Sequence, residues 1–306
     1  MTRILVTGAS GLLGLNFSLQ NAAQHEITGV VNSQALRPQS PFKVLAADLS
    51  QPGSGSALLE AEQPEILLHC AAVANLETAE KYPALARRVN AELPGELAEA
   101  SRRLGVRMVH LSTDAVFDGT HGPYSESDQP NPVSAYARSK WFGEQAVAAA
   151  NPQAIIARVN FYGWSLNGRR SLAEFFYNAL SAGKPANGWT DVFFCPLEVN
   201  TLGSLLLEMA QQGLEGLYHV VSPECLSKYD FGRRLAQSFG FDETLIKPTR
   251  VAESGLSAAR SPDLRLSTNK LSRDLGHALP GQAEGLARFR KQFTDGYPER
   301  LRSLAL

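Results

Sequence analysis

The chain has 306 residues, with 29 lysines and arginines against 30 aspartates and glutamates. This length is enough for one large α/β unit or a main domain with a smaller one, and the balanced charge, without long runs of one sign, argues against nucleic acid or an anionic membrane as a partner. The three cysteines show no CxxC or Cys/His spacing, so neither a disulfide framework nor a metal site is expected. The composition favours an enzyme that acts on a small molecule.

No basic and apolar leader opens the chain, and no apolar run approaches the roughly 20 residues that a membrane span needs. We therefore expect a cytoplasmic protein in a reducing environment.

Short apolar segments alternate with helix-like stretches through the first half of the chain. The helical stretches fall near residues 12–23, 76–104 and 134–150, and the second is interrupted around Pro83 and Pro94. Near-continuous apolar strands separated by helices predict an α/β fold, a Rossmann-type doubly wound parallel sheet. The strand segments are RILVTG (3–8), EITGVV (26–31), FKVLAAD (42–48), EILLHCAA (65–72), VRMVHLST (106–113) and AIIARVN (154–160).

The rhythm changes after Asn160. Longer helical stretches follow, broken by Pro- and Gly-bearing segments, with only short strand candidates such as GLYHVV at 216–221. We expect residues 1–160 to form the dinucleotide-binding domain and residues 161–306 a smaller, mixed substrate-binding lobe, with some chain crossing back to the main domain.

The segment RILVTGASGLLG places three glycines directly after the first strand and at the start of the first helix. Gly8 permits a tight turn, Gly11 lets a pyrophosphate approach the backbone, and the helix N-terminus offers free N–H donors. The strand, turn and helix stand in the order that this mechanism requires. We therefore predict that this segment binds the cofactor through Gly8, Ser10, Gly11, Leu12, Leu13 and Gly14.

An acidic residue that binds the ribose is expected at the end of the second strand, and it is missing. Asn32 and Ser33 stand there, with Arg37 shortly after. An arginine could pair with a 2′-phosphate, which favours NADP(H), with NAD(H) as the alternative cofactor. The competing interpretation of Arg37 is an exposed arginine on a loop.

The segment SAYARSKWFGE sets Tyr136 four residues ahead of Lys140 at the start of a predicted helix. Reduction of a carbonyl needs a hydride donor and an acid, and an unperturbed tyrosine, with a pKa of about 10, is a weak one. Lys140 on the same helical face can stabilise the phenolate. Thr113, at the end of the fifth strand, can hold the substrate carbonyl against the phenol.

The GxxGxxG spacing resembles the short-chain dehydrogenase/reductase superfamily. A narrower resemblance rests on HCAAVANLETAEKYPALARRVNAE, STDAVFDGTHGPYSESDQPNPVSAYARSKWFGE and RVNFYGWS. These segments are similar to the dTDP-4-dehydrorhamnose reductase family, densely over residues 3–165 and more loosely beyond. The resemblance implies NADPH-dependent reduction of the 4-keto group of a deoxysugar nucleotide. The family's catalytic positions fall on Thr113, Tyr136 and Lys140, when VF here is aligned with the family's VY.

The same resemblance implies further contacts. Cofactor contacts are expected from Asn32, Ser33, Arg37, Asp48, Leu49, Ala71, Ala72, Val73, Asn90, Ser112, Tyr136, Lys140, Asn160 and Phe161. Substrate contacts are expected from Val73, Asn75, Thr113, Asp114, Phe117 and Tyr136. His69 and Cys70 are interpreted as parts of a packed strand, and Trp164 and Trp189 as core residues rather than stacking platforms.

Four points stay open in the sequence. One alternative is an NAD-dependent sugar-nucleotide epimerase, whereas dehydration is disfavoured because Asp114 has no neighbouring glutamate. Another is a non-catalytic NADP-binding regulatory subunit. The nucleotide base is undetermined, since GKPANGWTDVFFCPLEVN departs from the family's usual text, and a homodimer is allowed but not indicated.

Overall fold

The computed structural model describes residues 1–253 and 261–306. Its main element is a seven-stranded parallel sheet with the strand order β11-β6-β5-β4-β1-β2-β3. Chain order runs outward from β1 in one direction and from β4 in the other, so the switch point of the topology lies between these two strands. The strands are β1 (Arg3–Thr7), β2 (Glu26–Val31), β3 (Lys43–Ala46), β4 (Ile66–His69), β5 (Arg107–Thr113), β6 (Ile155–Val159) and β11 (Gly216–Val220).

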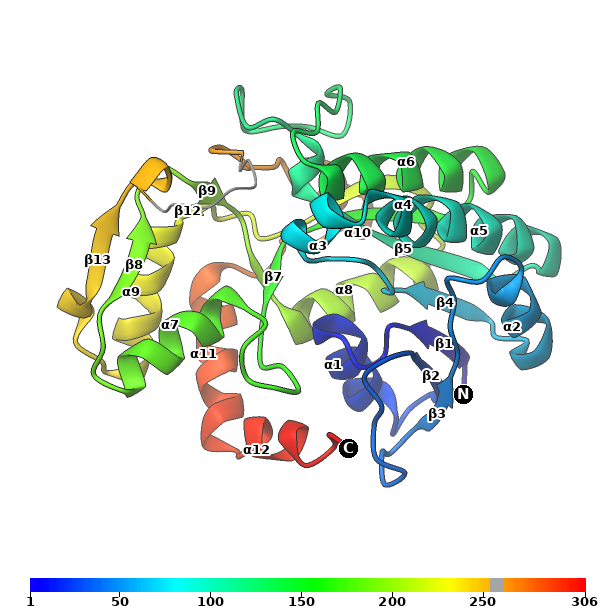
Figure 1. Cartoon of the computed structure of the whole chain (residues 1–306), viewed down its shortest axis with the longest axis horizontal. Helices are drawn as coiled ribbons and strands as arrows, with labels where there is room; N and C mark the ends of the chain where they lie inside the picture. Colours follow the sequence, from blue (N-terminus) through cyan, green and yellow to red (C-terminus); the bar gives the residue numbers. More distant parts are fainter. Residues whose placement is uncertain (254–260) are drawn as a thin grey trace.

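Helices cover both faces of the sheet, and the alternation of side chains along β1 shows why. Ile4 and Val6 join the core beneath α1 (Leu12–Asn21) and α8 (Val199–Gln212), whereas Leu5 joins the core on the opposite face. The helices of that second face are α2 (Ser54–Glu62), α5 (Leu93–Leu104) and α6 (Ala135–Ala150). The predicted Rossmann-type fold is confirmed (Figure 1).

The predicted interruption of the helical stretch 76–104 is also present. It forms α3 (Leu76–Lys81), α4 (Pro83–Arg87), the π-helical turn η1 (Arg88–Glu92) and α5, so both prolines stand in the first turn of a helix. Proline is tolerated there because the first N–H groups of a helix have no intrahelical partner.

The smaller lobe lies to the left of the sheet in Figure 1, where α7, α9, β8 and β13 are grouped. The segment GLYHVV does not belong to it, because β11 pairs with β6 at the edge of the main sheet. The lobe and the elements near it are β7 (Phe161–Tyr162), α7 (Leu172–Ser181), β8 (Ala186–Trp189), β9 (Phe193–Phe194), β10 (Leu197–Glu198), β12 (Leu226–Ser227), α9 (Lys228–Phe239), η3 (Glu243–Leu245), β13 (Ile246–Thr249), η4 (Val251–Glu253), α10 (Asn269–Leu275), α11 (Gln282–Thr294) and α12 (Tyr297–Arg302).

A disulfide joins Cys195 to Cys225, and this corrects the expectation from cysteine spacing. The two residues are 30 positions apart in the chain, and β9 and β12, which adjoin them, pair as antiparallel strands. That pairing brings the cysteines together, and spacing alone does not report it. Disulfides persist mainly in oxidising compartments, and a reducing cytoplasm stays a prediction.

Within residues 1–253 and 261–306, no helix combines the length and the apolarity that crossing a membrane requires.

Candidate functional site

A cavity of about 1080 Å³ lies at the carboxyl ends of the central strands, next to the switch point. Parallel α/β sheets bind their ligands at this position, because the loops that leave neighbouring strands diverge there. Residues from β1, β2, β4, β5 and β6 or from the loops that follow them line it.

The glycine-rich turn forms one wall of the cavity. Gly8 adopts the left-handed conformation with φ 68°, and a Cβ built there would lie 2.9 Å from the backbone nitrogen of Ala71. A Cβ on Gly14 would clash with the carbonyl group of Gly8. Gly11 caps α1 without a side-chain hydrogen bond, and Gly11, Leu12 and Leu13 of this helix start line the cavity. These features fit the pyrophosphate of a dinucleotide.

Most of the site residues expected from the sequence line this one cavity. They are Gly8, Ser10, Gly11, Leu12, Leu13, Gly14, Asn32, Ser33, Asp48, Leu49, Ala71, Ala72, Val73, Asn75, Ser112, Thr113, Asp114, Tyr136, Lys140, Asn160 and Phe161. Three of the expected residues are absent from the lining, namely Arg37, Asn90 and Phe117.

Asn90 lies behind the wall instead. Its side chain accepts a hydrogen bond from the backbone N–H of Val73 at 2.8 Å, donates to the carbonyl oxygen of Val73 at 3.1 Å and donates to the hydroxyl of Ser139 at 2.9 Å. Asn90 therefore holds the loop after β4 against α6 and does not itself line the cavity.

Phe117 and Arg37 are also engaged elsewhere. The ring of Phe117 is fully buried and stacks on Tyr124, with ring centroids 4.0 Å apart. Arg37 donates from Nε to the carbonyl oxygen of Ala305 at 2.7 Å, and its own N–H donates to Leu304 at 2.9 Å. Contacts with the C-terminal segment therefore hold this arginine outside the cavity lining.

Tyr136 stands in the first turn of α6, which Ser134 caps through a hydrogen bond from the N–H of Ala137. The pKa of Tyr136 is raised to about 12, first because surrounding protein removes water from the phenol and then because Asp114 is negative, while a hydrogen bond with Thr113 opposes the rise. The phenol is therefore a weaker acid in this cavity than a free tyrosine, and stabilisation of its anion by Lys140 stays a prediction.

Lys140 lies one helical turn further along and is 3% exposed. Burial lowers the pKa of its ammonium to about 8, and the negative charge of Glu144 acts in the opposite direction. Glu144 is itself buried, where it pairs with Arg158 at 2.7 Å and accepts a hydrogen bond from Ser112 at 2.5 Å. Glu144, which belongs to a buried ion pair with Arg158, therefore acts on the charge of Lys140.

A chain of polar contacts joins the end of β5 to the end of β6. The hydroxyl of Thr113 donates to one carboxylate oxygen of Asp114 at 3.1 Å, and the amide of Asn160 donates to the other at 2.6 Å. Burial raises the pKa of Asp114 to about 6 despite these hydrogen bonds. Lys228, at the start of α9, opposes this rise by its positive charge.

His69, on β4, and His110, on β5, form a stacked pair with ring centroids 5.4 Å apart. Burial and the charge of Lys140 lower the pKa of His69 to about 3, so both rings are neutral at physiological pH. Cys70 also lines the cavity, and burial raises the pKa of its thiol to about 12. His69 is thus a packed strand residue, and Cys70 is an unreactive part of the wall.

Several residues of the cavity were not expected from the sequence. Arg169 and Arg170 come from the loop before α7, and Gln34 follows β2. The adjacent arginines are visible in the sequence, but their distance from β2 depends on how the smaller lobe folds back. Trp164 and Trp189 do not line the cavity, and Trp164 is buried against Phe289.

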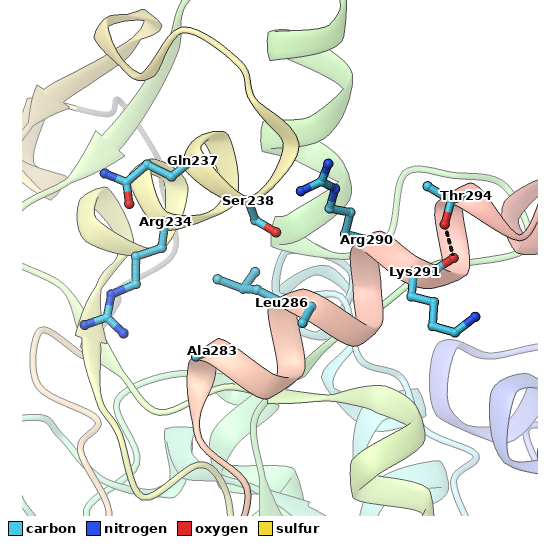
Figure 2. Close-up of a pocket in the computed structure, with 9 residues that line it drawn as sticks. Arg234, Gln237, Ser238, Ala283, Leu286, Arg290, Lys291 and Thr294 are labelled. Carbon is cyan, nitrogen blue, oxygen red and sulfur yellow. Dashed lines mark hydrogen bonds between the residues drawn. The ribbon is translucent and has the colours of Figure 1, made fainter.

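A second hollow, of about 620 Å³, lies between α9 and α11 (Figure 2). The cationic ends of Arg234 and Lys291 point away from each other, and each pairs with a carboxylate, that of Glu224 and that of Asp295. The polar groups that line this hollow do not converge on a common point. In the part of the chain that the structure describes, no group of three or more His, Cys, Asp or Glu could hold a metal ion.

Known proteins resemble this chain over most of its length. The family model described as RmlD substrate binding domain matches residues 1–295. The probable low-salt glycan biosynthesis reductase Agl14 of Haloferax volcanii is 31% identical, covering 95% of this chain and 98% of that protein. The dTDP-4-dehydrorhamnose reductase of Mycobacterium tuberculosis is also 31% identical, covering 88% of this chain and 86% of the relative.

A solved structure carries a cofactor. It is dTDP-4-dehydrorhamnose reductase from Bacillus anthracis in complex with NADP, 26% identical, with a TM-score of 0.80, covering 95% of this chain and 99% of that one.

A different kind of relative is similar as well. The methionine adenosyltransferase 2 subunit beta of Bos taurus is 27% identical, covering 85% of this chain and 78% of that protein. Family membership and the reaction of this chain are therefore separate questions. The match over residues 1–295 and the reductase relatives settle the first: the chain belongs to the RmlD substrate-binding-domain family, among the NAD(P)-dependent oxidoreductases of the extended short-chain type.

Proposed function

We propose that this protein uses NADPH to reduce the 4-keto group of a deoxysugar nucleotide. The observation that carries the proposal is that Thr113, Tyr136 and Lys140 line the same cavity as the glycine-rich turn. A nicotinamide cofactor supplies the hydride of such a reaction, and the residues of the cavity must supply the proton and hold the substrate.

Tyr136 is the proton donor in this proposal. A phenol with a pKa raised to about 12 stays protonated throughout the physiological range, so it is available as an acid. An alkoxide that develops on the substrate is a stronger base than a phenolate, and the proton transfer from Tyr136 is therefore downhill. Lys140, next to the phenol on α6, offers a positive charge to the phenolate that remains.

Thr113 and Asp114 hold the sugar. The hydroxyl of Thr113 can donate to the carbonyl oxygen that is reduced, once it turns from Asp114. Asp114 and Asn75 offer polar groups to the sugar hydroxyls from the same cavity. In this arrangement, residues 1–160 supply most of the contacts to the cofactor, and residues 161–306 complete the cleft.

The cofactor is NADP(H) in this proposal, with NAD(H) as the weaker alternative. No carboxylate follows β2 to repel a 2′-phosphate, since Asn32, Ser33 and Gln34 stand there. The NADP complex of a reductase in the same family supports the same choice.

The test mixes purified protein with NADPH and a panel of 4-keto-6-deoxy nucleotide sugars that carry thymidine, uridine, guanosine or cytidine diphosphate. We expect loss of nicotinamide absorbance with at least one of them, and product analysis will show a 4-hydroxyl sugar. Conversion of a sugar without net use of NADPH would instead support an epimerase.

The similarity to methionine adenosyltransferase 2 subunit beta favours one second candidate, a non-catalytic NADP-binding regulatory subunit. Thr113, Tyr136 and Lys140 are all present here, which supports chemistry. Tight NADPH binding with no turnover of any sugar in the panel would support the regulatory subunit.

A further inference from the structure

Two adjacent arginines from the smaller lobe line the end of the cavity where β2 finishes. Arg169 and Arg170 lie in the loop between β7 and α7, and they share the lining with Asn32, Ser33 and Gln34. In this fold class, the residues directly after β2 meet the adenosine ribose of the cofactor. The arginines therefore stand at the position where NADP and NAD differ, since only NADP carries a phosphate on that ribose.

A defined contact holds Arg170 at this place. Its Nη2 donates to the side-chain oxygen of Gln34 at 2.8 Å, across 136 positions of the sequence. The backbone behind it is fixed, because the N–H of Arg170 donates to Glu174 at 2.9 Å and Ser171 forms a capping box with the same glutamate. The guanidinium is thus presented from a well-bonded loop.

The guanidinium groups of the two arginines have no acidic partner in the part of the chain that the structure describes. Among residues 1–253 and 261–306, neither guanidinium has a carboxylate within ion-pair distance. Asp48 is the acidic residue that lines the cavity near the end of β2. One of its carboxylate oxygens accepts a hydrogen bond of 3.0 Å from the N–H of Ser50. A guanidinium without a carboxylate partner matches the charge and the planar geometry of a phosphate.

Arg37 is the residue that the sequence predicted to pair with the 2′-phosphate, but it lies elsewhere. Its Nε donates to the carbonyl oxygen of Ala305, and it is not part of the lining. It offers a matched comparison, because both arginines are exposed and, among the described residues, each guanidinium makes one hydrogen bond. Arg37 donates to a backbone oxygen, and Arg170 donates to Gln34.

We propose that Arg170, with Arg169 beside it, recognises the ribose 2′-phosphate of NADP(H), and that Arg37 does not. Gln34 keeps the guanidinium in place until the phosphate arrives. Because the arginines belong to the smaller lobe and the glycine-rich turn to the main domain, a bound 2′-phosphate ties the two together. The inference rests on the proposed use of NADP(H).

The experiment measures ligand binding rather than turnover. Kd values for NADPH, NADH, 2′,5′-ADP and 5′-ADP are determined by calorimetry for wild type, Arg170→Gln and Arg37→Gln. We expect Arg170→Gln to weaken NADPH and 2′,5′-ADP by ~10- to 100-fold, the scale of a lost charged hydrogen bond. NADH and 5′-ADP should change by less than about 2-fold, since they lack the phosphate. Arg37→Gln should leave all four Kd values near those of wild type.

Two results would overturn the proposal. One is a loss of NADPH affinity in Arg37→Gln with none in Arg170→Gln, and the other is an equal effect of Arg170→Gln on the ligands with and without the phosphate. Arg170→Lys is a further check, since it keeps the charge but not the planar fork, and it should fall between wild type and Arg170→Gln. None of these readouts needs a sugar substrate, so a failure of the proposed reductase activity would be seen separately in the turnover assay.

Discussion

The side-chain amide of Asn160 donates a hydrogen bond of 2.6 Å to the carboxylate of Asp114, and this contact joins the ends of β6 and β5 inside the cavity. Although the hydrogen bond favours the charged carboxylate, burial outweighs it, and the pKa of Asp114 is raised to about 6. Ionisation of Asp114 therefore lowers the unfolding free energy of the protein.

Asp114→Asn should remove that cost. The folded protein binds a proton on Asp114 more tightly than the unfolded chain, so wild type loses unfolding free energy as pH rises from about 4 to about 6. The penalty is absent below the first value and complete above the second. Relative to wild type, we expect the mutant to gain roughly 3 kcal/mol over this interval at most. Urea unfolding of both proteins at several pH values between 4 and 7 measures the change.

Asp118→Asn is a matched control with the opposite sign. Hydrogen bonds from Thr120, Asn131 and Tyr124 hold the pKa of Asp118 below its ordinary value. Its stabilising effect is present above the ordinary carboxyl pKa and is lost as pH falls below it. This mutant should therefore be less stable than wild type at pH 7. A constant stability difference between wild type and Asp114→Asn across all pH values would show that Asp114 does not titrate near pH 6.

The fold could be predicted from the sequence because its strands are buried on both faces and therefore read as continuous apolar runs. The glycine-rich turn, Tyr136 and Lys140 were found because their spacing is local, within one turn or one helix. Arg170 and the disulfide between Cys195 and Cys225 were not, since both depend on segments that are far apart in the chain. The pKa of Tyr136 was missed for a related reason: the helix shows Lys140 nearby, but burial and Asp114 are set by the tertiary structure.

The disulfide between Cys195 and Cys225 determines how many thiols of the chain should react. Protein that is purified in air, without reductant, and then unfolded should expose one reactive thiol, that of Cys70. After reduction, all three cysteines of the chain should react. A chromogenic disulfide reagent counts them, and Cys70→Ser is the control, because its count before reduction should fall to zero. Three thiols in the unreduced wild type would contradict the bond.

Tyr136→Phe should leave NADPH binding intact and lower the rate of carbonyl reduction by at least ~100-fold, the usual scale for lost acid–base assistance. Phenylalanine keeps the aromatic ring in the first turn of α6 but lacks the hydroxyl group that would donate the proton. Stopped-flow turnover and equilibrium binding of NADPH separate the two effects. Tyr82→Phe is the matched control, because Tyr82 is 50% exposed and lies outside the cavity lining. Near-full activity of Tyr136→Phe would exclude this residue as the proton donor.

If Lys140 acts as we propose, we expect Glu144 to set the alkaline limit of activity through it. The lysine needs its charge to stabilise the phenolate of Tyr136, and with a pKa lowered to about 8 it loses that charge as pH rises through this value. We therefore expect kcat to fall above about pH 8. Because the charge of Glu144 raises the pKa of Lys140, Glu144→Gln should move the fall in kcat to lower pH.

The same substitution leaves Arg158 buried without its ion-pair partner, which costs on the order of 3–5 kcal/mol of stability. Glu198→Gln separates the two effects, since Glu198 is also a buried carboxylate but does not act on Lys140. Rates of both mutants are compared with wild type between pH 6 and 10, at temperatures where each remains folded. If Glu198→Gln shifts the pH profile as much as Glu144→Gln does, then general destabilisation, rather than the charge beside Lys140, sets the alkaline limit.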